Sequence, residues 1–364
     1  MRLLTRHAGW LPLDDLRAIR DGRIHPRAIA RDRRHGSRPV IGYVGCLGHG
    51  NLGDEVMFEA ARRIMAARAR LVPLQPHLTE TILALAGRSG DRFFDGLILG
   101  GGTLISPGWA QRVTDALKMG VPIWTLGTGA GSAGFGDVPN PAMDVWSPIL
   151  RKFSAVGVRG PLSQERLARL GIDEASVIGD LACTLVVERP VPASGDRIAV
   201  NWAGQEAAGT RHALVDHLRL AVQDGATVVP VATDPTDLVP LHELMIELGL
   251  PDTGVNYTSS FSSFKLLVET CTYSVNMRLH ATVLSHCLGV PALAIAYRDK
   301  VIDYMASVGE TEWCVSTTDV DSMAEKLGIL HATAPDLRGA VVDEINARAT
   351  AIRTYADGVL SRVI

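Results

Sequence analysis

The chain has 364 residues, of which 47% are hydrophobic, so it is long enough to form two domains with a buried core in each. Its formal net charge of −3 argues against nucleic acid as a partner. The five cysteines are scattered and form no CxxC pair, which argues against a disulfide framework or zinc site and favours a cytoplasmic location. No apolar run reaches the roughly 18–20 residues that would span a membrane.

The first 39 residues differ in charge from the rest of the chain. They carry ten arginines and four aspartates, a net charge of +6, although the whole chain has a net charge of −3. A basic segment with interspersed leucines and a tryptophan suits a short helix packed on a domain. It also suits a segment that rests on the anionic inner face of a membrane. Peripheral membrane contact is therefore one expectation for residues 1–39.

From residue 40 onward, apolar runs rich in β-branched residues alternate with stretches of helical spacing. This alternation indicates parallel strands covered by helices on both faces. The first series of strands is expected within 40–46, 71–74, 95–104, 121–131, 154–163 and 176–182, with a helix at 56–69.

The stretch ERPVPASGD (188–196) separates this series from a second one. Its strands are expected within 196–204, 225–234, 271–276 and 290–297, with helices beginning near Arg211, Pro235, Arg278 and Arg298. The tail has helical apolar spacing. We therefore predict a basic arm at 1–39, Rossmann-like domains at 40–187 and 188–335, and a C-terminal helix at 336–364.

The predicted fold class is α/β, with two Rossmann-like, doubly wound domains that face a cleft. Ligands bind such sheets beyond the carboxyl ends of their strands. Two clusters of glycines, Gly100–Gly102 and Gly127–Gly131, follow buried strands there and leave room for a ligand. The turn GHGNLGD (48–54) has the glycine spacing of a dinucleotide fingerprint, but the following strand ends without the acidic residue that binds ribose. We therefore expect no nicotinamide cofactor.

The segment from Cys271 to Lys300 is the richest in chemical groups. It places Arg278 and His280 where a buried strand turns into a helix, and Lys300 after the next strand. A guanidinium, an imidazole and a helix N-terminus at one point suit an anion that also exchanges a proton. The alternative is a helix that begins with two polar residues facing water. His286 lies six residues after His280, on another face of a helix, so the two do not form a metal pair.

Other polar residues also lie on the turns after strands. Arg159 precedes Pro161, which suits a first helical turn, and can bind a carboxylate or phosphate bidentately or form a surface salt bridge. Asp180 could orient an arginine or a sugar hydroxyl, or cap a turn. His49 could contact a sugar, and Asp54 is placed to cap the helix that follows it. Cys271 and Cys287 are expected to be buried small hydrophobic residues.

The segment NMRLHATVLSHCLGVPALAIAYRDKV (276–301) resembles the C-terminal motif of the polysaccharide pyruvyltransferase family, which pairs an R-L-H helix start with a G-V-P strand and Y-x-x-K. Three more segments match in order: GYVGCLGHGNLGDE (42–55), GGGTL (100–104) and VRGPLSQERLARLG (158–171). The resemblance covers about residues 40 to 310. The chain departs from the family at Gly160, where an acidic residue is usual, and in its basic arm.

The resemblance implies a GT-B-like transferase that places a pyruvate ketal on two hydroxyls of a sugar. The donor would be phosphoenolpyruvate, phosphate would be released, and the sugar would belong to a cell-surface polysaccharide or exopolysaccharide, or to its precursor. No cofactor and no metal are implied beyond this donor.

The family match also implies roles for residues of this chain. Phosphoenolpyruvate would contact Arg159, Arg278, Leu279 through its backbone N–H, His280 and Lys300. His280, next to Arg278, would be the general acid/base. Its charged form is disfavoured by Arg278 and the helix dipole until phosphate binds. Candidate acceptor contacts on the first domain are His49, Asn51, Asp54, Thr103 and Asp180.

Two other function classes share these features. A GT-B glycosyltransferase with a nucleotide-sugar donor has the same architecture, and a non-catalytic carbohydrate-binding protein would keep only the sugar contacts. Phosphate release from phosphoenolpyruvate would identify the first function, and nucleoside diphosphate release the second.

Overall fold

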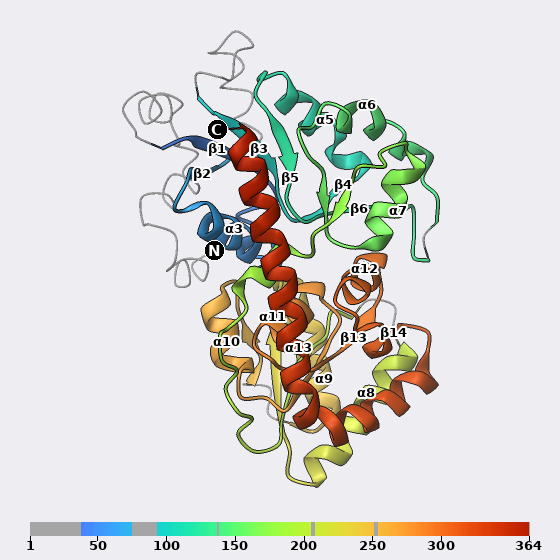
Figure 1. Ribbon diagram of the computed structural model, residues 1–364. Coiled ribbons are helices and arrows are strands. Elements are labelled where there is room, and N and C mark those ends of the chain that lie inside the picture. The colour runs from blue at the N-terminus through green and yellow to red at the C-terminus, as the bar shows by residue number, and fades with distance from the viewer. Residues whose placement is uncertain (1–37, 75–92, 137, 205–207, 251–253, 364) are drawn as a thin grey trace.

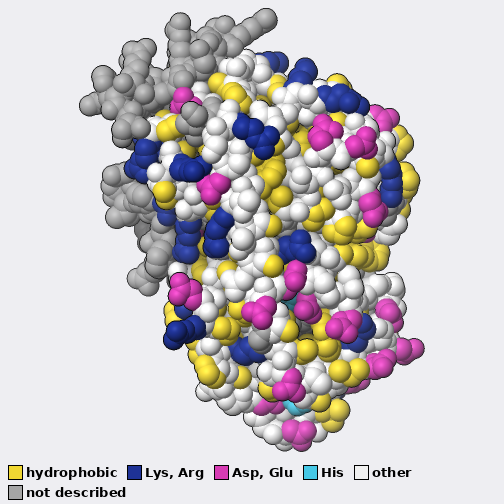
Figure 2. Space-filling view, viewed as in Figure 1, with side chains coloured by type: hydrophobic (Ala, Val, Ile, Leu, Met, Phe, Trp, Pro, Cys, Tyr) yellow, Lys and Arg dark blue, Asp and Glu magenta, His cyan; other side chains and the backbone are white. Residues whose placement is uncertain are grey.

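The computed structural model describes residues 38–74, 93–136, 138–204, 208–250 and 254–363 (Figure 1). The basic arm, for which we considered membrane contact, lies outside these residues except for its last two. In the described part, no helix is both long and apolar enough to cross a membrane. On the face shown in Figure 2, acidic and basic side chains are interspersed.

The first half of the chain forms two four-stranded sheets in which every strand pair is parallel. One sheet has the order β2-β1-β3-β5 and the other β4-β6-β7-β8. Their strands are β1 (Val40–Val44), β2 (Arg70–Pro73), β3 (Gly96–Leu99), β4 (Gly102–Ile105), β5 (Ile123–Thr125), β6 (Thr128–Ala130), β7 (Gly157–Val158) and β8 (Ser176–Val177).

Two of the runs in which a strand was expected contribute a strand to each of these sheets. The run 95–104 forms β3 and β4, and the run 121–131 forms β5 and β6. Gly102 and Gly127 have φ of 96° and 70°, which is incompatible with a continuous strand. The buried strands β3 and β5 thus end at the glycines, as expected, and the glycine turns lead the chain into β4 and β6 of the other sheet.

Helices of the first half follow the strand ends. They are α3 (Leu52–Met65), α5 (Pro107–Leu117), α6 (Trp146–Leu150) and α7 (Pro161–Arg169), with 3-10 turns η2 (Pro141–Met143) and η3 (Leu181–Leu185). Helix α3 starts before the predicted residue 56, because Asn51 Oδ1 accepts from the backbone N–H groups of Gly53 (2.9 Å) and Asp54 (3.3 Å). Asn51 is thus the N-cap. The prediction that Asp54 caps this helix is wrong.

The second half forms one six-stranded parallel sheet with the order β11-β10-β9-β12-β13-β14, the strand order of a doubly wound dinucleotide-binding fold. Its strands are β9 (Arg197–Asn201), β10 (Thr227–Ala232), β11 (Asn256–Tyr257), β12 (Tyr273–Asn276), β13 (Ala292–Ala296) and β14 (Cys314–Ser316). Its helices are α8 (Ala208–Gln223), η4 (Pro235–Asp237), α9 (Leu238–Glu247), α10 (Phe261–Val268), α11 (Leu279–Cys287), α12 (Asp299–Ser307) and η6 (Thr311–Trp313). The predicted boundary at 187/188 falls between η3 and β9 and stays a prediction.

The last helix, α13 (Val320–Val363), runs from the second half onto the first (Figure 1). We expected it to begin at Asp336, directly after a proline. Pro335 instead lies inside the helix, and buried apolar side chains continue on both sides of it, such as Leu327 and Ile352. Packing of this continuous apolar face outweighs the cost of the proline. Arg353 Nη2 donates to the carbonyl of Thr184 (3.1 Å), which ties α13 to η3.

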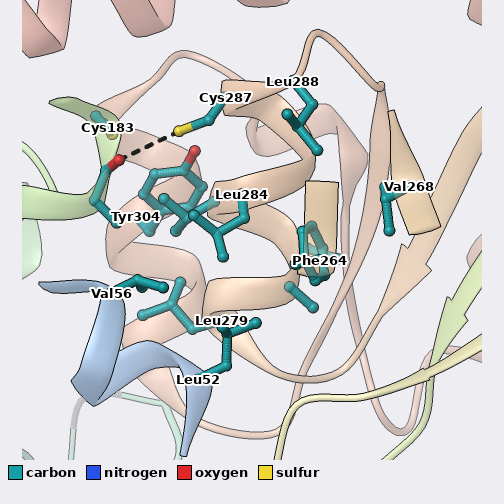
Figure 3. Packing of buried hydrophobic residues seen from close by; sticks show 14 of the residues in the cluster. Leu52, Val56, Cys183, Phe264, Val268, Leu279, Leu284, Cys287, Leu288 and Tyr304 are labelled. Carbon is teal, nitrogen blue, oxygen red and sulfur yellow. Dashed lines mark hydrogen bonds between the residues drawn. The ribbon is translucent and has the colours of Figure 1, made fainter. Parts of the chain in front are cut away.

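An apolar interface joins the two halves of the molecule. Leu279 and Leu284 of α11 belong to the same buried cluster as Leu52 and Val56 of α3 (Figure 3). Cys287 donates its Sγ–H to the carbonyl of Ala182, 3.4 Å away. Both Cys287 and Cys271 are fully buried, as predicted. This packing fixes the N-terminal end of α11 against the first half of the molecule.

Candidate active site

Arg278 and His280 lie where β12 gives way to α11, at the carboxyl end of the second sheet. Arg278 has extended backbone dihedrals and is the N-cap residue of α11. Its backbone N–H donates to Asn201 Oδ1 (2.9 Å), at the end of the neighbouring strand β9. The predicted strand-to-helix turn is therefore confirmed. The adjacent parallel strand holds it in place.

The guanidinium of Arg278 is anchored from one side. Its Nε and Nη2 lie 2.8 and 2.7 Å from Asp237 Oδ1, and Nη2 also donates to Thr236 Oγ1 (2.8 Å). Burial alone would lower the pKa of Arg278, but the fully buried carboxylate of Asp237 raises it above its usual value. These bonds use Nε and Nη2.

The N-terminus of α11 adds backbone donors beside Arg278. Among the described residues, the side chain of Arg278 makes no capping bond to the first turn of this helix. The N–H groups of a first turn have no partner within their own helix, and the helix dipole places partial positive charge there. The backbone N–H groups of the first-turn residues Leu279 and His280 can therefore bind an anion at the end of the helix where Arg278 lies.

The imidazole of His280 lies between two groups of the first half of the molecule. Its Nε2 is 3.5 Å from Asp180 Oδ2, without forming a hydrogen bond. On the other side the ring lies against Gly53 of α3, where an added Cβ would overlap it. His280 is 13% exposed in its side chain, whereas Asp180 is fully buried. The general acid predicted from sequence is thus placed by residues of both halves.

Arg159 is buried at the junction of the two halves, with an exposure of 1%. Its Nε is 3.4 Å from Asp303 Oδ2 of α12, and the rest of the guanidinium lies against Gly129. Nε and Nη1 have no hydrogen-bond partner within the described part of the chain. Because buried charged donors are normally bonded, these nitrogens indicate a place for an anionic ligand. The surface salt bridge considered as an alternative for Arg159 is excluded by its burial.

Lys300 lies near Arg278, with Tyr297 between them. Lys300 Nζ is 5.4 Å from the centre of the Tyr297 ring. Burial would raise the pKa of Tyr297, but the positive charges of Lys300 and Arg278 hold it below its usual value. The Y-x-x-K part of the sequence motif therefore brings a second cation near Arg278, and the contact of Lys300 with a donor stays a prediction. Tyr297 itself was not among the predicted site residues.

Asp54, a predicted acceptor contact, lies close to charged residues of the second half. Burial raises its pKa, and the charges of His280, Lys300 and His49 partly oppose this shift. The side chain thus lies in the field of residues from both halves. A carboxyl group with a raised pKa is suited to exchange a proton with a hydroxyl.

The other predicted acceptor contacts have different surroundings. His49 is exposed, in the turn before α3. Asn51, besides capping α3, donates through Nδ2 to Asp234 Oδ2 (2.8 Å). Thr103 lies on β4 beside Gly131, and its buried hydroxyl has no partner among the described residues. Asp180 is fully buried and faces His280 rather than solvent. The acceptor roles of these residues stay predictions.

The turn 48–53 also closes the two halves onto each other. The backbone N–H of Leu52 donates to the carbonyl of Thr233 (2.8 Å), and the Tyr257 hydroxyl donates to the carbonyl of Gly50 (2.6 Å). Both partners belong to the second half. The glycine-rich turn therefore serves as an interdomain contact in addition to bordering the site.

No group of three or more His, Cys, Asp or Glu residues within the described ranges is arranged to hold a metal ion. His286 is buried, and its Nδ1 lies 3.0 Å from the Tyr304 hydroxyl, away from His280.

Comparison with known protein families decides where this chain belongs. The sequence model of the family described as Polysaccharide pyruvyl transferase matches residues 51–299, more than half of the chain. The chain belongs to the polysaccharide pyruvyl transferase family. Membership confirms the resemblance drawn from the motifs and makes the protein a transferase. The matched region contains Arg159, Arg278 and His280, and ends one residue before Lys300. A comparison with curated proteins found no match.

Three solved structures have folds similar to that of this pyruvyl transferase family member. Anabaena HepE in complex with UDP and glucose is 13% identical, with a TM-score of 0.55 over 89% of this chain and all of the other. A Rickettsia africae glycosyltransferase is 12% identical, with a TM-score of 0.55 over 90% and 99% of the two chains. UDP-GlcNAc 2-epimerase from Neisseria meningitidis is 11% identical, with a TM-score of 0.54 over 88% and 99%. At these identities the similarity shows the fold alone, and it confirms the predicted GT-B-like α/β architecture.

The departure from the family at Gly160 has a structural explanation. A Cβ at Gly160 would overlap the backbone carbonyl and the carboxylate of Asp303. Asp303 accepts bonds from the Ser163 backbone (3.1 Å) and hydroxyl (2.6 Å), and lies 3.4 Å from Arg159 Nε. The carboxylate beside Arg159 thus comes from the other half of the molecule.

Sequence reasoning missed Asp237, Asn201 and Asp303. For Asp237 a signal existed, because Asp234 and Asp237 flank Pro235 with the spacing of a capping box, which the structure contains. Asn201 and Asp303 had no comparable local signal, since their roles depend on contacts between distant segments.

Proposed function

We propose that this transferase moves pyruvate from phosphoenolpyruvate onto two hydroxyls of a sugar. The product would be a pyruvate ketal on a cell-surface polysaccharide or exopolysaccharide, or on its precursor, and phosphate would be released. The observation that carries the proposal is the buried guanidinium of Arg159, whose Nε and Nη1 have no hydrogen-bond partner among the described residues, at the same domain junction as His280. Family membership supports pyruvyl transfer in general.

The donor needs two anion-binding groups, because it carries both a phosphate and a carboxylate. Arg159 from the first half and Arg278 from the second are suited to bind them, together with the first-turn N–H groups of α11. Arg278 is anchored by Asp237, so its guanidinium has a fixed direction. Lys300 adds a mobile positive charge from α12. Groups from both halves would thus meet on one small anion.

The chemistry requires one proton at the methylene carbon of the donor. His280 gives this proton, the central carbon becomes electrophilic, and the first sugar hydroxyl attacks it. Phosphate then leaves, and the second hydroxyl attacks the same carbon. Each hydroxyl loses one proton. One of these two protons reprotonates His280, and the other leaves with phosphate. Asp54 is placed in the field of His280 and Lys300, where a carboxylate can accept such a proton.

The proposal is tested by incubating the purified protein with phosphoenolpyruvate and a panel of galactosides and N-acetylmannosamine-containing acceptors. We expect acceptor-dependent phosphate release and a product heavier than the acceptor by one pyruvate less one water. Nucleoside diphosphate release from nucleotide sugars, without use of phosphoenolpyruvate, would instead identify a glycosyltransferase. Neither product over the whole panel would indicate a carbohydrate-binding protein.

The role of His280 has its own test. Replacing it by alanine (His280→Ala) should reduce kcat about 100-fold or more, because general acid–base catalysis supplies rate factors of that order. Binding of phosphoenolpyruvate, measured by calorimetry, should persist because Arg159 and Arg278 remain. Near-wild-type turnover in this variant would show that another group delivers the proton.

A further inference from the structure

Asp180 has an unusual position for a carboxylate. It is fully buried at the start of η3, and its Oδ1 accepts the backbone N–H of Ala182 (3.0 Å). Its Oδ2 has no hydrogen-bond partner in the described residues and lies 3.5 Å from His280 Nε2. The His280 atom is equally buried and unpaired. One oxygen of Asp180 therefore fixes the turn, and the other is directed at the imidazole.

Two buried polar atoms without partners are costly when they stand apart. A proton on His280 Nε2, shared toward Asp180 Oδ2, would satisfy both with a small movement of the ring. The ring cannot move freely in the opposite direction, because it lies against Gly53 of α3. Asp180 and Gly53 thus hold the imidazole from two sides.

The charges around this imidazole come from several elements. Asp180 faces it from η3 and Asp54 from α3, while Arg278 precedes it on its own helix. Arg159 acts on the pair through Asp180. Burial would raise the pKa of Asp180, but the charge and the side-chain hydrogen bonding of His280, the charge of Arg159 and the Ala182 N–H lower it below its usual value. Asp180 is therefore ionised at neutral pH and can stabilise an imidazolium.

We propose that Asp180 is a positioning residue that holds His280 in orientation and in its protonated form, from across the domain boundary. The inference rests on the proposed role of His280 as proton donor. Asp180 and Gly53 belong to the first half of the molecule and His280 to the second. The proton donor is therefore complete only when the two halves are in contact, and Asp180 remains ionised while His280 gives up its proton.

The test is Asp180→Asn, which keeps an oxygen to accept the Ala182 N–H and so preserves the turn. We expect kcat to fall about 10- to 100-fold, with a change in KM for phosphoenolpyruvate of less than about threefold. A rate that depends on a protonated histidine falls as pH rises. Removing the carboxylate destabilises the imidazolium, so this decline should begin at lower pH in the variant.

The matched control is Asp196→Asn. Asp196 also pairs with a histidine, since its Oδ2 lies 3.8 Å from His331 Nε2, but both side chains are more than one third exposed and lie outside the site. We expect wild-type kcat, KM and pH profile. In a His280→Ala background, Asp180→Asn should cause no further loss of kcat. Losses that multiply in the double variant would show that Asp180 acts independently of His280 and would overturn the proposal.

A measurement without substrate separates this inference from the proposed function. In protein labelled with ¹⁵N-histidine, the His280 signal is identified by its loss in His280→Ala. Its titration midpoint should shift to lower pH in Asp180→Asn and stay unchanged in Asp196→Asn. An unshifted midpoint would overturn the role of Asp180, whatever the donor is. If the shift occurs but the wild-type protein does not use phosphoenolpyruvate, the proposed function fails and the Asp180–His280 pair stands.

Discussion

Arg159 is a buried cation with two nitrogens that have no hydrogen-bond partner among the described residues, although its Nε lies 3.4 Å from Asp303 Oδ2. Such an arrangement costs stability in the free protein unless a ligand completes it. Replacement by lysine (Arg159→Lys) keeps the charge but loses the planar fork that matches a carboxylate or phosphate. We expect KM for phosphoenolpyruvate to rise about 10- to 100-fold, as for a lost charged hydrogen bond. Steady-state kinetics over a range of donor concentrations would show this, and an unchanged KM would place Arg159 away from the donor.

His286 shows how strongly the interior acts on a single side chain. Burial lowers its pKa from 6.5 to about 3. Between these values the unfolded chain binds a proton that the folded protein excludes, so stability falls as pH falls below 6.5. In His286→Gln this contribution disappears. Thermal unfolding followed from pH 7 to pH 4 should therefore show a shallower loss of stability in the variant, and equal slopes would contradict the assignment.

At the scale of elements, the first turn of α3 supports the ring of His280. Adding a methyl group there (Gly53→Ala) should displace the ring or separate the two halves, because the new Cβ would overlap the imidazole. We expect kcat to fall at least about tenfold while the helix persists, since alanine favours helices. The matched control is Gly108, because it is the second residue of α5 and Gly53 is the second residue of α3.

A Cβ at Gly108 meets no atom within 4 Å, so Gly108→Ala should keep wild-type kinetics. Circular dichroism would confirm that both variants fold. Equal activity of the two alanine variants would show that the contact between Gly53 and His280 is unimportant.

The elements that sequence predicted best are those with local signals. The strand-to-helix turn at Arg278 could be predicted because an apolar run, polar residues and helical spacing follow one another directly. The presence of two strands within 95–104 could not be predicted, because it depends on the positive φ of Gly102. The pairing of His280 with Asp180, and of Arg159 with Asp303, joins residues far apart in sequence. Such pairs arise when the two halves pack together, and the sequence around each residue contains no signal for such long-range contacts.

At the scale of the whole molecule, a buried ion pair holds the halves together. Asp299 of α12 accepts from Arg166 Nη2 (2.6 Å), the Ser132 hydroxyl (2.7 Å) and the Gly136 backbone (2.8 Å), all in the first half. Replacing it (Asp299→Ala) leaves the Arg166 guanidinium buried without this carboxylate. We expect the free energy of unfolding to decrease by about 3–5 kcal/mol.

Asp216 provides the control for this prediction, because it pairs with Arg219 on the exposed face of α8. Asp216→Ala should change stability by less than about 1 kcal/mol. Denaturant unfolding of the two variants should therefore differ clearly. Equal midpoints would show that the ion pair of Asp299 and Arg166 does not stabilise the contact between the halves.

Helix α13 has a consequence for the order in which the protein matures. Its distal part, including Ile345, Ile352 and Val359, is buried, and Arg353 bonds to η3 of the first half. Ribosomes synthesise a chain from its N-terminus, and domains generally begin to fold as they emerge. The first half must therefore wait with part of its apolar surface uncovered until the last turns of α13 have left the ribosome. Nascent chains halted before residue 345 should consequently be preferred targets for chaperones.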